Sequence, residues 1–296
     1  MKKIYLLLLL YGFYWTSSVA QVTTPNNIQE ALSDEDAFLD SLSWLYPEKT
    51  GTLSFRLGYT NHAYFAGRDY DIKQYMLMPS ITYQHKSGVY ADLSGLSYSQ
   101  SNPMYEMTMA SVGYMGIVGS NFWFFGEYSR TFLTKPDPDN PNPIPNALTV
   151  FAMYDLGKVM PSVAYAYMFG DETTQRIIPS VSGYFAKKLN GFIDRITFSP
   201  GISVTLGTTN SYYFNYVPTP NPGRFPPVTL TPTLYATEHF GVMAYTLSAP
   251  VSFRMKSLRL TFTPNLIKPV KLYSAEDITT NRKVNFSVSL YYSLGI

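Results

Sequence analysis

Apolar side chains alternate strictly with polar, small or amphipathic ones over the last thirteen residues of the chain. The apolar positions are Val284, Phe286, Val288, Leu290, Tyr292, Leu294 and Ile296. A period of two is that of a β-strand, whose successive side chains point to opposite faces of the sheet. The pattern therefore predicts a strand with one face against an oily medium and the other face against a wet one.

The same alternation recurs within residues 53–60, 163–169, 195–206 and 258–263. A soluble β-sandwich also has alternating strands, but three features favour a transmembrane barrel. The alternating stretches predict strands of roughly 10–15 residues, against a usual length of about 5–6. The chain has 26 Tyr and 19 Phe, as the aromatic girdles of membrane barrels require. The polar face is rich in Ser, Thr and Gly rather than in Lys and Glu.

Composition excludes several other classes of protein. The chain has no Cys, which excludes thiolate zinc sites, iron–sulfur clusters and disulfide scaffolds. A formal net charge of +2 gives no basic face for nucleic acid. The three His residues have no metal-ligand spacing, so neither a metal nor a cofactor is expected. A mean hydropathy of -0.06 is too polar for a bundle of membrane helices.

The first twenty residues predict a secretory signal peptide. A basic start, Met1 to Lys3, precedes an apolar run from Ile4 to Trp15, and small residues follow at Ser18 to Ala20. The run is too short for a membrane span, which needs about 20 apolar residues, and cleavage is expected after Ala20. No later apolar run is long enough for a transmembrane helix, so the mature chain is either soluble or crosses a membrane as a barrel.

Turn signals predict the number of strands. Short turns are expected at 86–88, 119–121, 155–158, 189–191 and 256–257, and longer connections near 67–71, 100–103, 135–146, 170–174, 208–232 and 274–281. Short and long connections alternate, as they do in outer-membrane barrels. Six long and five short connections predict a closed antiparallel barrel of about twelve strands over residues 51–296, with both termini in the periplasm. The longest connection is expected at 208–232.

Six of the predicted strands contain a proline, at Pro79, Pro161, Pro179, Pro200, Pro250 and Pro264. Proline removes a hydrogen-bond donor from the ladder, so bulge or rim positions are expected for these residues.

Residues 21–50 form a separate acidic segment, with six Asp or Glu and one Lys. Residues 51–296 hold 19 Lys or Arg against 14 Asp or Glu. Ser33 and Asp36 resemble a helix N-cap with an acidic first turn, and Phe38, Leu42 and Leu45 follow at helical spacing. A short amphipathic helix is expected over about 34–45. It serves either as a periplasmic tether, with a periplasmic partner, or as a plug in the lumen.

Six charged residues have the parity of the polar face: Arg56, Asp92, Glu127, Arg195, Arg254 and Arg259. Arginine facing lipid costs about 2–4 kcal/mol at the bilayer midplane, so these residues are expected to line the lumen. They either line an aqueous path and set its selectivity or pair with each other and fill the interior. Twelve strands lie between the packed barrel of eight and the open pore of sixteen, so both roles stay open.

One short motif resembles a catalytic one. Residues 83–88 contain His85, Ser87 and Gly88, and this His-x-Ser-Gly is similar to the His-x-Ser-Asn-Gly of the outer-membrane phospholipase family and the His-x-Ser-Asn of lipid A deacylases. The resemblance implies a Ser87 nucleophile activated by His85, but the Asn is missing here. Ser-Gly is also a common turn pair, and no catalytic residue is expected.

Taken over residues 51–296, the chain resembles the outer-membrane β-barrel proteins of Gram-negative bacteria. The Tyr-rich strands and the stretch 85–98 are similar to uncharacterised barrels of the Bacteroidota kind. The final strand resembles the C-terminal signal read by the barrel-assembly machinery, although it ends in Ile296 rather than an aromatic residue. The resemblance implies an outer-membrane location and contact with outer-membrane lipid.

Three functions are compatible with such a barrel. The leading hypothesis is a porin-like passive channel or small-solute transporter with a mildly basic lumen. The second is a structural or docking barrel with a filled lumen, which binds a periplasmic partner through residues 21–50. The third is an outer-membrane lipid hydrolase that uses Ser87 and His85.

Overall fold

The computed structural model describes residues 50–62, 64, 74–100, 104–134, 144–220, 228–274, 276 and 278–296, and within these it describes the side chains outside 212–236. The expected signal peptide at 1–20 and the helix at 34–45 lie outside the described residues. Within the described ranges, no helix has the length and hydropathy needed to cross a membrane.

All regular structure in this part of the chain is β-strand. The strands are β1 (Gly51–Thr60), β2 (Met76–His85), β3 (Val89–Tyr98), β4 (Tyr105–Val118), β5 (Phe122–Leu133), β6 (Asn146–Tyr154), β7 (Val159–Phe169), β8 (Thr173–Gly183), β9 (Phe185–Lys188), β10 (Arg195–Phe198), β11 (Gly201–Pro220), β12 (Val228–Ser248), β13 (Val251–Met255), β14 (Leu258–Pro269) and β15 (Lys283–Gly295).

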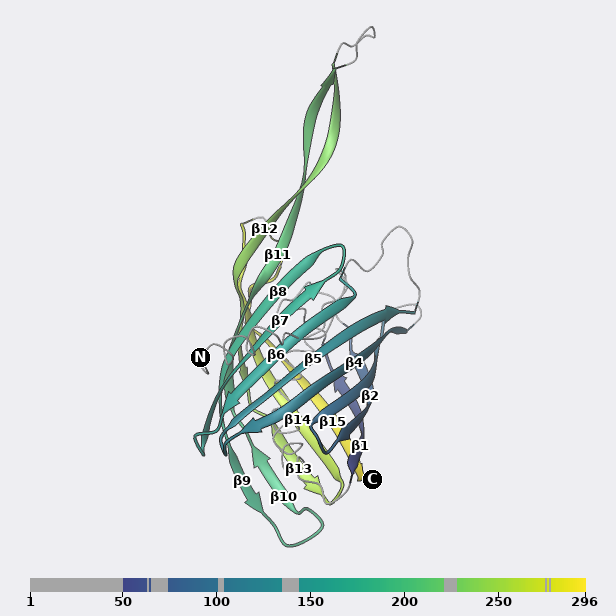
Figure 1. The fold of residues 1–296 in the computed structure, drawn as a ribbon. Coiled ribbons are helices and arrows are strands. Elements are labelled where there is room, and N and C mark those ends of the chain that lie inside the picture. Colours follow the sequence, from purple (N-terminus) through teal and green to yellow (C-terminus); the bar gives the residue numbers. More distant parts are fainter. Residues whose placement is uncertain are drawn as a thin grey trace, which may run out of the picture.

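The strands form one closed antiparallel barrel (Figure 1). Strands that lie side by side in the barrel pair antiparallel, and β1 closes the barrel by pairing with β15 from Thr52↔Gly295 to Thr60↔Ser287. Three pairs of consecutive strands, β8 with β9, β10 with β11, and β12 with β13, do not pair with each other and are each separated by one or two residues. Counting each pair as a single crossing, the fifteen strands make twelve crossings. The predicted fold class and strand number are therefore confirmed.

The two termini of the barrel and the short turns share one edge, which we call the short-turn edge. Gly51 exchanges two backbone hydrogen bonds with Ile296 and pairs with His85. The turns at 86–88, 119–121, 155–158 and 256–257 separate consecutive strands as predicted, and the turn at 189–191 lies within the β9–β10 connection. The long connections leave from the opposite edge.

The expectation of a long loop at 208–232 is wrong. β11 and β12 pair continuously from Gly201↔Ser248 to Pro220↔Val228, and they rise well beyond the rest of the barrel as a hairpin (Figure 1). The aromatic residues that suggested an exposed loop also have high strand propensity. Neighbouring strands pair with this hairpin only near its base, up to Gly207 in β11. Prolines at 218, 220 and 232 are tolerated above that level because strand edges are unpaired there.

Four of the six strand prolines stand at gaps or breaks, whereas Pro161 and Pro264 have regular cross-strand partners in β8 and β15. Next to Pro79, the β2–β3 ladder has no paired residues between Leu77↔Ser97 and Ser80↔Ser94. Next to Pro179, the β8–β11 ladder has a similar gap. Pro200 and Pro250 instead stand in the breaks between β10 and β11 and between β12 and β13. These breaks lie between paired stretches of one crossing, so Pro200 and Pro250 are at irregular positions within the wall and not at its rim.

The two faces of the wall differ in chemistry, as the alternation predicts. Outward side chains are apolar and exposed, for example Leu57 at 50% and Leu290 at 41%. Their inward neighbours are small and polar, and Thr52 and Ser293 are only 4% and 2% exposed. An apolar outer band of this kind is the surface that a lipid bilayer covers.

Part of the inner face is apolar rather than polar. One buried cluster lies mainly on β6, β7 and β8 and includes Phe151, Met153, Met160 and Met168. A second, on β2, β3 and β4, includes Met76 and Tyr98. Methionine is unbranched and adapts to irregular space, so these clusters fill parts of the interior that a uniformly polar lumen would leave open.

Candidate functional site

The charged residues of the inner face form two groups, one basic and one acidic. In the basic group Arg56 is half-buried on β1 and has the same parity as the buried Thr52 and Thr60. Its cross-strand partners are Ser80 on β2 and Tyr291 on β15. The pleat of the strand therefore places the Arg56 side chain on the inner face.

A row of direct cross-strand partners connects Arg56 to the other predicted arginines. Its members, in spatial order, are Lys188, Arg195, Arg254, Arg259, Tyr291 and Arg56. The guanidinium of Arg259 lies 5.2 Å from the ring centroid of Tyr291, a cation–π distance. The Tyr291 hydroxyl in turn donates a 2.7 Å hydrogen bond to Ser54 Oγ. Tyr291 thus links the cationic part of the row to the wall at β1.

Three of the four predicted arginines lie close to the short-turn edge. Arg195 begins β10, Arg254 is one residue from the end of β13, and Arg259 is one residue from the start of β14. Arg56, by contrast, is five residues inside β1. Alternation in the sequence defines the face on which a residue lies, but the level along the barrel depends on where each strand begins.

The acidic group comes from β3 and β5, on either side of β4. Thr82 Oγ1 donates a 2.5 Å hydrogen bond to Asp92 Oδ1, and the Tyr90 hydroxyl donates a 2.6 Å hydrogen bond to Glu127 Oε2. Ser111 is a further hydrogen-bond partner of Glu127. Both carboxylates are therefore held by hydroxyl donors on neighbouring strands.

The basic and acidic groups meet at Arg56 and Asp92. The two side chains interact electrostatically, although β2 separates their strands. Asp92 also interacts with Glu127 as a like charge. The structure therefore brings together Arg56, Asp92 and Glu127 of the six predicted residues, and gathers the other three arginines near the short-turn edge.

Gly113 on β4 makes the acidic group possible. It pairs with both Tyr90 and Glu127, and a Cβ at this position would lie 2.6 Å from Cζ and from the hydroxyl oxygen of Tyr90. No side chain larger than hydrogen fits while Tyr90 keeps this position. The sequence offered no sign of this role, because neither face of residues 104–118 is cleanly polar.

Two further cations of the inner face were not predicted. Arg176 on β8 is buried at 6% exposure and has small cross-strand partners, Ala166 and Gly207. Lys188 is the partner of Arg195. The shared parity of Arg176 with Ser180 and Ser182 is the sequence signal that indicates its inward position.

His85 and Ser87 lie in the exposed turn between β2 and β3. His85 Nδ1 is 2.8 Å from Ser87 Oγ and accepts a 3.2 Å hydrogen bond from the Ser87 backbone N–H. These are local contacts over two residues, and the turn is completed by a hydrogen bond from the Gly88 N–H to the His85 carbonyl. The pair stands at the short-turn edge beside Gly51.

Across the described part of the chain, no group of three or more His, Cys, Asp or Glu side chains has the geometry to hold a metal ion. The candidate site is the charged inner face described above.

Comparisons with known proteins found similar barrels among solved structures. No protein-family model matches the chain, and no curated protein matches it. The KdgM porin is 9% identical, with a TM-score of 0.46 over 82% of this chain and 99% of that one. The NanC porin is 9% identical, with a TM-score of 0.43 over 82% and 100%. LpxR from Salmonella typhimurium is 6% identical, with a TM-score of 0.41 over 81% and 99%. The twelve-crossing barrel is established by its own strand pairing, and these likenesses add no argument about function.

Proposed function

We propose that the chain is an outer-membrane channel that passes small solutes through a narrow, charged lumen. The observation that carries the proposal is the pair of charged groups on the inner face, with Arg56 on β1 against Asp92 and Glu127 on β3 and β5. The two carboxylates are held on the inner face by hydrogen bonds from Thr82, Tyr90 and Ser111.

Opposed charges on a narrow inner wall select among solutes. They create a field across the path, which orients polar solutes and favours ions of one sign. The arginines at 56, 176, 195, 254 and 259 outnumber the carboxylates of Asp92 and Glu127 on the inner face described above. We therefore expect a mild preference for anions, and for small polar solutes over apolar ones.

Planar bilayers with refolded protein test this proposal. We expect stable conductance steps, with an anion preference that falls in Arg56→Ala and stays unchanged in the control Lys268→Ala. Lys268 is exposed and lies at the opposite end of the barrel, and it has the outward parity of Phe262. Absence of conductance, or a cation preference that Arg→Ala substitutions leave unchanged, would rule out the proposed channel.

A specific observation favours a second candidate, the structural or docking barrel with a filled lumen. Many inward side chains are almost fully buried, including the Met-rich clusters and small residues such as Ser129 and Thr149. In that case residues 21–50 contact a periplasmic partner. Crosslinking from that segment that recovers only the barrel itself would count against a separate partner.

The orientation of the barrel in the membrane is part of the same proposal. With short turns in the periplasm, both ends of the barrel domain lie there and the β11–β12 hairpin projects outward from the cell. Protease added to intact cells is then expected to cut within 221–227 and to spare the turn at 189–191. Cleavage at the second turn alone would reverse the orientation.

A further inference from the structure

We propose that the acidic segment of residues 21–49 docks on the basic row formed by Lys188, Arg195, Arg254 and Arg259 at the short-turn edge. The docking surface is made of described residues on β9, β10, β13 and β14, of which Lys188, Arg195 and Arg254 are at least partly exposed and Arg259 is the buried end. Its occupant is the stretch of the same chain that leads into β1. The docking does not depend on whether the barrel conducts.

The row places four cations directly opposite one another. Lys188 pairs with Arg195, Arg195 with Arg254, and Arg254 with Arg259. Directly opposed side chains in an antiparallel sheet have Cβ atoms about 4.5–5.5 Å apart, and like charges there are destabilising. The row is complementary in charge to a segment with several negative charges.

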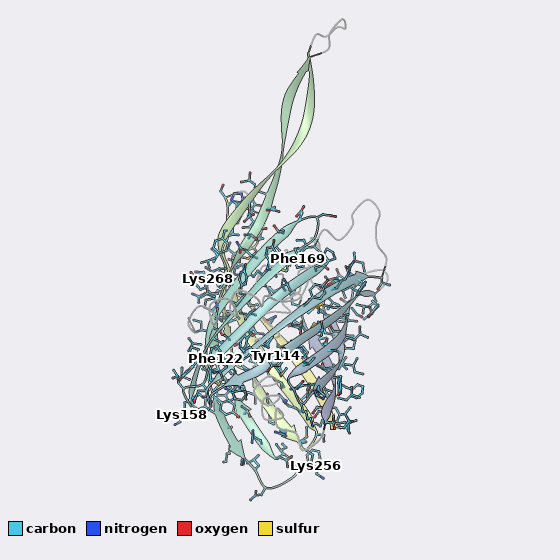
Figure 2. The ribbon with its side chains drawn as sticks, in the orientation of Figure 1. Tyr114, Phe122, Lys158, Phe169, Lys256 and Lys268 are labelled. Carbon is cyan, nitrogen blue, oxygen red and sulfur yellow. The ribbon has the colours of Figure 1, made fainter. Side chains whose placement is uncertain are left out.

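Other cations of the short-turn edge extend the basic surface. Lys86, Lys158, Lys187 and Lys256 are exposed on the same edge, and Figure 2 labels Lys158 and Lys256 at the lower end of the barrel. The turn at 119–121 has no charged residue, so the basic surface covers one arc of the edge. This asymmetry makes the position of a docked segment testable.

Two carboxylates on this edge already have local partners. Asp194 Oδ2 accepts a 2.5 Å hydrogen bond from the Lys256 backbone N–H, and Asp155 Oδ1 accepts a 2.6 Å hydrogen bond from the Gly157 backbone N–H. Both carboxylates fix turns. Both keep their negative charge, but the eight Lys and Arg residues named above outnumber them, so the edge keeps an excess of positive charge.

The acidic segment joins the barrel at this same edge. Thr50, the last residue before β1, accepts a 3.1 Å hydrogen bond from the Lys86 backbone N–H. Residues 21–49 hold six Asp or Glu and one Lys, and 29 residues span up to roughly 95 Å when extended, so the whole row is within reach. A tether of this kind gives an effective concentration on the order of millimolar.

The face on which the row lies distinguishes this occupant from membrane lipid. Arg195, Arg254 and Arg259 are each two residues from a buried inward side chain, namely Thr197, Ser252 and Thr261. Alternate residues of a strand share a face, so the arginines point to the interior. Lipid headgroups contact the outside of the wall. An acidic segment entering from the open end of the barrel reaches the inner face directly.

Disulfide crosslinking of the full mature chain in lipid vesicles tests the proposal, because the native chain has no Cys. We would compare Ser41→Cys combined with Asn190→Cys against Ser41→Cys combined with Ser120→Cys. Asn190 and Ser120 are both exposed turn residues of the short-turn edge, but only Asn190 adjoins the row. We expect at least fivefold faster disulfide formation with Asn190→Cys, and loss of that advantage near 1 M salt, where the Debye length is about 3 Å.

Charge reversal supplies the decisive variants. Lys188→Glu with Arg195→Glu is expected to abolish the fivefold advantage, and the added changes Glu35→Lys and Asp36→Lys are expected to restore it. Equal crosslinking to both turns, or an advantage that high salt leaves intact, would overturn the proposal. Disulfide formation that is faster with Asn190→Cys in zwitterionic vesicles, but equal for the two turns in anionic vesicles, would show that lipid headgroups occupy the row instead.

Discussion

The hydroxyl of Tyr90 crosses β4 above Gly113 and donates a 2.6 Å hydrogen bond to Glu127 Oε2 on β5. Two strands that do not pair with each other are thus joined through the inner face of a third. Ser111 adds a second donor to Glu127. The arrangement fixes the direction of a carboxylate that we place beside the solute path.

Gly113→Ala is expected to destabilise the barrel by about 1–3 kcal/mol, the usual cost of overpacking. The new Cβ would overlap the Tyr90 side chain and lie 2.7 Å from the Gly126 carbonyl oxygen. The Tyr90 side chain could rotate away, but the Gly126 carbonyl belongs to a paired strand and cannot move without disturbing the sheet. Urea unfolding in lipid vesicles measures the change. Gly191→Ala is the matched control, because nothing lies within 4 Å of a Cβ there. Equal stability of the two variants would contradict the close approach at Gly113.

Tyr90→Phe and Glu127→Gln are expected to be coupled. A hydrogen bond to a charged group contributes about 1.5–3 kcal/mol, so the double variant should lose less stability than the sum of the single ones. The free energies of unfolding of the four proteins give the coupling energy. Additive effects would mean that Tyr90 and Glu127 do not stabilise each other.

Asp92→Asn is expected to change ion selectivity in the direction opposite to Arg56→Ala. Removing the carboxylate leaves the positive charge of Arg56 dominant at that level, so the anion-to-cation permeability ratio should rise by about twofold or more. Reversal potentials in a salt gradient measure the ratio. Lys268→Ala, which removes an exposed charge of the outer face at the opposite end of the barrel, serves as the control. A lower ratio in Asp92→Asn would contradict the proposed path.

Charge on the outer face is expected to cost more at mid-strand than at the strand end. Leu290→Arg near the middle of β15 should lose about 2–4 kcal/mol, and Val284→Arg at its end about 0–1 kcal/mol. Both side chains are exposed outside the barrel, Val284 at 73%. Unfolding in vesicles compares the two. Equal costs would show that the bilayer does not cover the outer face with its midplane near Leu290.

Ser87→Ala is expected to leave outer-membrane lipid turnover unchanged. His85 Nδ1 accepts a hydrogen bond from the backbone N–H of Ser87, so the imidazole stabilises the turn locally. Phospholipid and lipid A profiles of cells that carry the variant, the native protein or a deletion provide the measurement. A deletion phenotype reproduced by Ser87→Ala would establish the hydrolase instead.

The sequence predicted most of the barrel because the alternation that forms its strands is local. The register of β15 against β1 keeps Leu290 opposite Leu57 and Ser293 opposite Ser54, so each face stays chemically uniform. Strand number followed from turn residues such as Gly88, Gly119 and Gly157, all with positive φ. Glycine adopts that conformation without steric cost.

The failures lie where local patterns are ambiguous or where strand level matters. Tyr212 and Phe214 are compatible with both exposed loops and strands, so the sequence predicts a loop where the structure has a long hairpin. The level of Arg195, Arg254 and Arg259 near one edge depends on strand tilt and stagger, which follow from closure of the whole barrel. The role of Gly113 is not predicted because it depends on contact with Tyr90 on the neighbouring strand β3, which a local pattern does not contain.

The three breaks in the wall run along one line from strand to strand. Gly183 donates to the Pro200 carbonyl at 2.7 Å, Ser199 to that of Pro250 at 3.1 Å, and Ala249 to that of Pro264 at 3.1 Å. A β-sheet bends most easily where backbone hydrogen bonds between strands are missing, and proline has no N–H to donate one. Among the described residues, only one backbone hydrogen bond spans the wall at each of these breaks, so the line is a place where the sheet can bend. The short strands β9, β10 and β13 lie below this line (Figure 1). They carry Lys188, Arg195 and Arg254, three of the four cations of the basic row. Bending of the sheet at the line therefore moves these cations and leaves the pairing between β1 and β15 intact.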